Sequence, residues 1–210
     1  MSNSLLIVRN QDPFYCGSFD GGEYDPSEAC FVCGTGARRV NPIKLPSSRL
    51  KDRVSITQKH EVVVPERIAE AIKRVAPHCL RQVLDRTTGD PTKFYELIAE
   101  TTLPRWSSQT TGWCLSQMDP PCPTCKRDGR FNVVKESLRL IYSGASPSFS
   151  AARTYEAFGK SRLLPKFRDS NFAVHFLIVC AKVMDLLRGE RGVEFVPVEW
   201  VTNSGAENWE

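Results

Sequence analysis

Cys30-Phe31-Val32-Cys33-Gly34 and Cys122-Pro123-Thr124-Cys125 are the two stretches of this 210-residue chain that decide its fold. Each places two thiols three positions apart, so that both sulfurs can face one ion about 2.3 Å away. Four thiolates in two such pairs are the usual ligand set of a structural, tetrahedral zinc site. We therefore predict that one structural Zn²⁺ ion is shared by Cys30, Cys33, Cys122 and Cys125, although residues 34–121 separate the two pairs.

Two other interpretations of these cysteines stay open at the level of sequence. They can form local disulfides, or they can be buried free thiols that act as small apolar side chains. Disulfides need an oxidising compartment. The apolar run near the start, residues 5–8, is too short for the core of a signal peptide or for a membrane span. We therefore expect a cytoplasmic protein, in which such spacings favour metal over disulfide.

Composition and pattern indicate a single α+β domain over residues 1–210. Charged residues make up 25% and hydrophobic residues 41%, as in ordinary globular proteins. Turn-forming residues precede the first cysteine pair, so we expect an irregular knuckle lobe formed by about residues 10–40 and 113–131. A small, mostly antiparallel sheet should complete the fold, with strands near residues 62–64, 93–101, 130–142, 172–178 and 193–198.

Helices are predicted near residues 65–86 and 179–188, to cover this sheet. Apolar residues recur at helical spacing from Ile68 to Leu84, and Pro77 should break or kink that first stretch. The second helix belongs to a strand–helix–strand unit over residues 163–201. Its last strand contains Pro197, which favours a position at the edge of the sheet.

Enzyme signatures are incomplete, so we predict that the protein is not an enzyme. The second cysteine pair matches half of the zinc deaminase signature, but none of His60, His78 and His175 supplies the other half, H-x-E. Four cysteine ligands would also leave zinc no open position for water. No glycine-rich phosphate loop is present, and we interpret residues 34–36 as knuckle geometry. Of the other cysteines, Cys180 is expected in the core and Cys79 half-buried, and Cys16, which precedes the first knuckle, is an alternative metal ligand; no function is assigned to Cys114.

Two surfaces are candidates for partner binding. Residues 38–53 carry six basic residues against one acid, which permits nucleic-acid binding, yet the net charge of the chain is only +4. Alternatively, Arg38 and Arg39, with Lys126 and Arg127, offset the charge of a zinc–tetrathiolate site. Arg105, Trp106 and Trp113 are the residue types that anchor protein interfaces. The alternative for the tryptophans is that they pack over the knuckle lobe.

The cysteine motifs and the C-terminal end resemble the double-CxxCG family described from myxobacteria, which includes immunity proteins against toxins delivered by kin cells. Residues 30–34 fit the first motif fully, and residues 119–129 resemble the second, with Lys126 in place of its glycine. Residues 163–169 and 192–195 resemble the closing segment of these proteins, which another group of bacterial immunity-like proteins shares. Residues 40–115 resemble the family poorly.

The resemblance implies a function, but it transfers no catalytic residue. The suspected metal ligands of the family correspond here to Cys30, Cys33, Cys122 and Cys125. It implies a zinc-containing immunity protein that binds and neutralises a cognate protein toxin. The runner-up interpretation, from the basic stretch and the cysteine pairs, is a zinc-ribbon protein that binds nucleic acid or acts in regulation. The substitution at Lys126 leaves the conformation of the second knuckle turn open.

Overall fold

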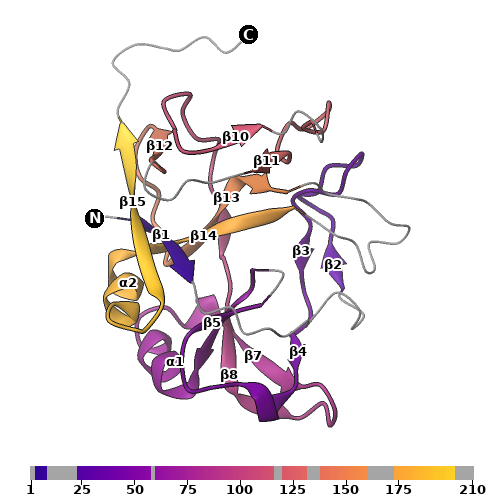
Figure 1. Cartoon of the computed structure of the whole chain (residues 1–210), viewed down its shortest axis with the longest axis vertical. Helices are drawn as coiled ribbons and strands as arrows, with labels where there is room; N and C mark the ends of the chain where they lie inside the picture. The colour runs from indigo at the N-terminus through magenta and orange to yellow at the C-terminus, as the bar shows by residue number, and fades with distance from the viewer. Residues whose placement is uncertain are drawn as a thin grey trace.

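Two β-sheets and two α-helices make up most of the regular structure. The computed structural model describes residues 3–8, 23–57, 60–115, 120–131, 138–159 and 173–201. The predicted α+β class is confirmed for these residues, and most strand pairs are antiparallel. The expectation of one small sheet is wrong, because the strands divide between a six-stranded and a five-stranded sheet (Figure 1).

The six-stranded sheet combines strands from both ends of the chain. In spatial order it consists of β12 (Leu140–Ser143), β15 (Val193–Val201), β1 (Asn3–Val8), β14 (Val174–Cys180), β13 (Ala151–Phe158) and β9 (Thr101–Thr102). Its pairs are antiparallel except β12 with β15 and β13 with β9. The predicted strands in residues 174–178 and 193–198 are therefore confirmed, whereas Phe172 lies outside the described residues.

The five-stranded sheet comes from the first half of the chain. Its order is β4 (Lys44–Leu45), β7 (Leu80–Asp85), β8 (Pro91–Leu97), β6 (Val62–Pro65) and β5 (Ser55–Ile56). Only β4 and β7 are parallel. Two short ribbons, β2 (Tyr24–Asp25) with β3 (Arg38–Arg39) and β10 (Cys114–Leu115) with β11 (Arg130–Phe131), flank the knuckles. Short 3-10 helices cover Ser47–Arg49 and Pro77–Cys79.

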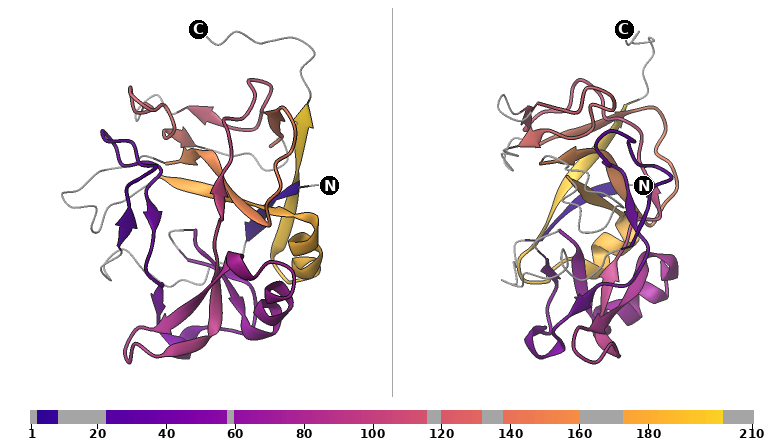
Figure 2. Two further views of the ribbon diagram at one scale, coloured as in Figure 1. Left: turned by 180° about the vertical axis from the view of Figure 1, so that it is seen from behind. Right: turned by 90° about the vertical axis from the view of Figure 1, so that its right-hand side faces the viewer.

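The two helices join the sheets through a shared core. α1 (Glu66–Lys73) begins directly after Pro65, and α2 (Ala181–Leu187) follows β14. They lie next to each other on one side of the molecule (Figures 1 and 2). Their buried residues form one apolar cluster with residues of both sheets: Leu6, Val62, Val64, Ile68, Ile72, Leu97, Ala151, Val179, Val183 and Leu187. The six- and five-stranded sheets therefore share one core.

Two details of the sequence prediction are wrong. The helix predicted over residues 65–86 ends at Lys73, and residues 80–85 form β7, which pairs with β8 in an antiparallel hairpin. Pro197 is not at a sheet edge, because β15 lies between β12 and β1. Pro197 is paired with Ser4 of β1, and the ladder with β12 begins one residue later, at Val198. The segment 163–169 lies outside the described residues.

No helix in the described part of the chain is long and apolar enough to cross a membrane.

Candidate metal centre

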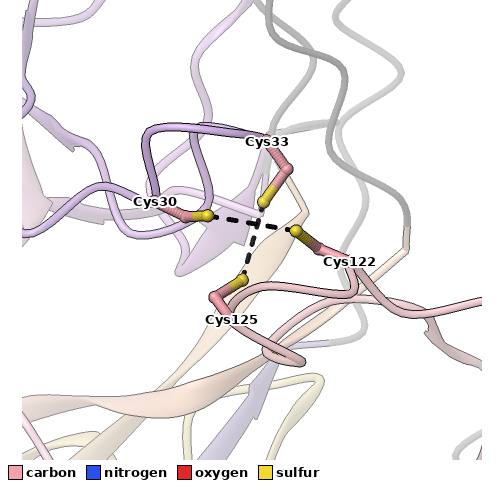
Figure 3. Close-up of side chains that lie close together, drawn as sticks. All are labelled: Cys30, Cys33, Cys122 and Cys125. Carbon is pink, nitrogen blue, oxygen red and sulfur yellow. Dashed lines mark hydrogen bonds between the residues drawn. The ribbon is translucent and has the colours of Figure 1, made fainter.

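The four predicted ligands lie together at one point. Their sulfur atoms are all within 4.8 Å of one another. Cys30 Sγ is 3.9 Å from Cys122 Sγ, and Cys33 Sγ is 3.6 Å from Cys125 Sγ. Figure 3 shows the four side chains pointing inward from the two knuckles, with these two contacts crossing. Both of these contacts join one knuckle to the other.

These distances match a tetrahedral metal site. Four sulfurs at about 2.3 Å from a central ion stand about 3.8 Å apart. A disulfide would bring two sulfurs to about 2.05 Å, and all four cysteines are free. The interpretation as ordinary apolar thiols fits poorly, because their cluster contains only these four side chains. The arrangement can hold a metal ion such as zinc.

Both knuckles use the same turn. The N–H of Gly34 donates to the carbonyl of Cys30 at 2.7 Å, and the N–H of Lys126 donates to the carbonyl of Cys122 at 2.9 Å. The turn requires a left-handed backbone, with φ of 78° at Gly34 and 54° at Lys126. Glycine adopts this conformation without steric cost, whereas lysine does not. The second knuckle therefore keeps the geometry of the first in spite of its substitution.

Three of the four ligands are buried, and Cys125 is half-buried. Cys30, Cys33 and Cys122 are 8%, 7% and 2% exposed. The residues between the ligands point outward instead, and Phe31 is 82% exposed. Catalytic zinc sites keep an open coordination position, whereas structural sites are filled by four protein ligands. The geometry is therefore that of a structural site.

Charged side chains hold the second knuckle, and among them the sequence pointed only to Arg127. The carboxylate of Asp128, fully buried, accepts a hydrogen bond from the N–H of Cys122 at 2.7 Å. Arg130 donates to the carbonyls of Lys126 at 3.0 Å and of Arg127 at 2.6 Å. Arg127 in turn donates to the carbonyl of Glu28, just before the first knuckle, at 3.0 Å. These contacts orient the ligands from outside the metal site.

The first knuckle is anchored to the six-stranded sheet. Arg153 of β13 donates to the carbonyls of Gly36 and, at 3.2 Å, of Ala37. A Cβ atom at Gly36 would stand 2.4 Å from Arg127 Nη1 and 2.4 Å from the carbonyl oxygen of Glu28, so only glycine fits here. The interpretation of residues 34–36 as knuckle geometry is confirmed.

The thiol pKa values differ within the cluster. Burial raises the pKa of Cys33 and of Cys125. Burial also opposes ionisation of Cys122, but hydrogen bonds from the backbone N–H groups of Cys125 and Thr124 and from neighbouring thiols bring its pKa down to about 7. Four thiols at such short distances, three of them buried, cannot all ionise without a cation between them, and a bound metal would supply that charge.

The other cysteines of the described chain stand apart from this cluster. Cys79 is fully buried, and its thiol donates to the carboxylate of Glu100 at 2.8 Å. Cys114 is exposed on β10, and Cys180 packs against the core at the start of α2. Cys16 lies outside the described residues.

Two of the predicted charge partners, Arg38 and Arg39, are paired with carboxylates, whereas Arg127 contacts the first knuckle. Arg38 forms an ion pair with Glu28 at 2.7 Å, and Arg39 forms one with Glu61 at 2.8 Å. Trp106 is 6% exposed, and its ring centroid is 5.6 Å from that of the half-buried Trp113. The tryptophans are therefore packing residues, but they pack in an apolar cluster with Leu140, Ile178 and Val198 of the six-stranded sheet rather than over the knuckle lobe. Arg105 is exposed, and its guanidinium lies over the ring of Tyr155.

The chain matches no model of a known protein family, no curated protein and no solved structure. The resemblance to the double-CxxCG family and the cytoplasmic location stay predictions.

Proposed function

We propose that the chain is a zinc-dependent immunity protein that binds and neutralises a protein toxin. The observation that carries the metal assignment is the closed group of four cysteine sulfurs at tetrahedral spacing. Zinc prefers this ligand set, and four ligands leave it no site for chemistry. The metal's role is mechanical: it ties the segment before β3 to the segment before β11.

The binding function is supported by the outer face of the first knuckle. Phe31 and Val32 lie between two metal ligands and are 82% and 46% exposed. A knuckle fixed at both cysteines presents these side chains rigidly, so little conformational entropy is lost when a partner covers them. Large aromatic side chains often dominate the energy of protein interfaces. The resemblance to immunity proteins supplies the class of partner, a toxin.

A co-purification experiment with the product of the neighbouring gene tests this proposal. Tagged protein should retain that product and restore growth of cells that express it. Phe31→Ser should weaken binding at least about tenfold. Val75→Ser is the matched control, because Val75 is 43% exposed and lies after α1. Absence of both binding and protection by the unaltered protein would contradict the immunity function.

Salt-dependent retention on DNA would instead favour the nucleic-acid alternative. The structure offers that alternative less support than the sequence did, because Arg38 and Arg39 are already engaged by carboxylates.

A further inference from the structure

A pocket of about 410 Å³ lies beside the second knuckle. It is lined by residues of that knuckle together with residues of β10, β11 and β13, which can be located in Figure 1. The apolar part of its wall is formed by Leu115, Pro121 and Pro123. Leu115 is 47% exposed, so an apolar surface is open to a partner here. The charged part of the wall is formed by Arg105, Lys126, Arg130 and Glu156.

Two of these four charged groups belong to the protein interior. Arg130 is buried and donates to backbone carbonyls of the second knuckle. Glu156 is 3% exposed and accepts from the N–H of Trp106 at 3.3 Å. Burial raises the pKa of Glu156 to about 7, so its carboxyl group is mainly neutral below that pH. The single acid of the lining therefore opposes an incoming anion only weakly.

The other two charged groups, Arg105 and Lys126, are exposed cations that lie close together. Arg105 Nη2 is 3.4 Å from the carbonyl oxygen of Cys125, in the peptide group that leads into Lys126. The Arg105 guanidinium lies over the ring of Tyr155, 5.1 Å from its centroid, and this contact holds it in place. Neither cation forms an ion pair with a carboxylate of the described residues. Since the lysine side chain is flexible, one carboxylate can contact both.

The backbone of Lys126 gives a second, independent indication. Its φ of 54° is left-handed, and the residue at the same place in the first knuckle is Gly34. This conformation costs lysine more than glycine. Residues in sparsely populated conformations cluster at binding and catalytic sites, where their side chains have a task. A lysine at this position is explained if its side chain, which lines the pocket, binds a partner.

We propose that this pocket receives an aspartate or glutamate side chain of the toxin, with an apolar residue next to it in the same segment. The carboxylate binds Arg105 and Lys126, and the apolar side chain packs against Leu115, Pro121 and Pro123. This inference rests on the proposed function and specifies the surface that the partner presents. Complementary charges of this kind speed association and exclude partners of the wrong charge.

Two peptides test the pocket without the toxin. Acetyl-Leu-Glu-Phe-Glu-amide and its counterpart with glutamine in place of both glutamates have the same shape and differ in charge. In NMR titrations of the zinc-loaded protein at about pH 6.5, below the pKa of Glu156, the acidic peptide should bind at least about tenfold more tightly. Tenfold corresponds to one hydrogen bond between charged groups. The preference should shrink in about 0.5 M salt, because exposed charges are screened.

Variants identify the two cations. Arg105→Gln and Lys126→Gln should each remove most of the preference, whereas Lys93→Gln, at an exposed lysine of β8, should keep it. Lys126→Gly should lose the preference as well, with its zinc content unchanged and its thermal midpoint not lowered. A lysine that only offsets the charge of the metal site would instead change zinc content, and that result would overturn the assignment. Equal binding of the two peptides, saturable binding of neither, or a preference that survives in both glutamine variants would also overturn it.

Co-purification with the product of the neighbouring gene distinguishes this inference from the proposed function. If the unaltered protein and both glutamine variants retain that product equally, toxin binding is supported and the role of the pocket is contradicted. If the acidic peptide binds selectively but the product is not retained, the pocket still selects acidic segments and the immunity function is contradicted. The expected result is retention by the unaltered protein and by Lys93→Gln, and at least about tenfold weaker binding by Arg105→Gln and Lys126→Gln.

Discussion

The knuckle lobe and the two-sheet body are stabilised in different ways. The shared core of the body contains fourteen buried residues from both helices and both sheets. The cluster within the lobe consists of four cysteine side chains and no other apolar residue. Apolar burial stabilises the body by many contacts spread over many residues. We propose that the lobe is held by the one metal ion that these cysteines can bind, so removal of that ion should affect the lobe far more than the body.

The largest effect is expected from loss of a metal ligand. Cys122→Ser should abolish most zinc binding and lower the thermal midpoint by about 10 °C or more, since structural zinc contributes several kcal/mol to folding. Amide hydrogen exchange should rise in residues 23–40 and 120–131 and stay slow in α1. Cys114→Ser, an exposed cysteine outside the cluster, is the control. An equal rise of amide exchange in α1 would contradict the separate stabilisation of the lobe and the body.

The opposite test removes apolar contacts from the core of the two-sheet body and leaves the metal ligands intact. Ile72 is fully buried in α1. Ile72→Ala should lower the free energy of unfolding by about 2–5 kcal/mol, with zinc content unchanged. Denaturant unfolding and elemental analysis measure the two quantities. A variant that loses its zinc in the folded state would show that the two regions are one cooperative structure.

The stability of the two regions should also change with pH in opposite directions. Burial raises the pKa of Glu156 in β13 to about 7, although the N–H of Trp106 and nearby arginines favour its ionised form. A raised carboxyl pKa stabilises the folded body below the unfolded value of about 4.3, and this stability is lost as the pH rises through 7. The knuckle lobe should instead lose stability as the pH falls, because protons compete with the metal for the cysteine sulfurs.

Glu156→Gln removes the contribution of this carboxyl group to the pH dependence of stability. The unaltered protein should lose up to about 3 kcal/mol more than the variant between pH 4.5 and pH 8. Urea unfolding at several pH values measures the difference. Parallel pH profiles for the two proteins would contradict the assignment.

The smallest effect concerns the two knuckle turns. Lys126→Gly should stabilise the protein by up to about 1 kcal/mol, because a left-handed backbone costs lysine more than glycine. Gly34→Ala should destabilise it by a similar amount. Both variants should keep their zinc. No gain in the thermal midpoint of Lys126→Gly would mean that the lysine side chain contributes contacts that offset its backbone cost.

The cysteine spacing was sufficient to predict the candidate site because its information is local. Two thiols three residues apart already define half of a tetrahedral site, and the missing glycine at Lys126 did not alter the turn. The fold could be predicted less completely from the sequence. Residues 80–85 have a spacing that fits a buried helix as well as a strand, and pairing with β8 decided between them. Pro197 was misplaced because its tolerance depends on where the β12 ladder begins.

Most of the side chains that hold the knuckles, Asp128, Arg130 and Arg153 among them, could not be predicted from the sequence. Arg153 and Gly36 are 117 residues apart in the chain, and no sequence pattern links them. Such pairs depend on the arrangement of the sheets, which the sequence pattern did not contain.

Zinc content per chain, measured by elemental mass spectrometry on protein purified without chelator, tests the central claim most directly. The four cysteine sulfurs within 4.8 Å of one another predict one zinc ion per chain and a loss of that ion in Cys33→Ser as well as in Cys122→Ser. Protein without metal, with all four thiols free to react and an unchanged thermal midpoint in both variants, would contradict it.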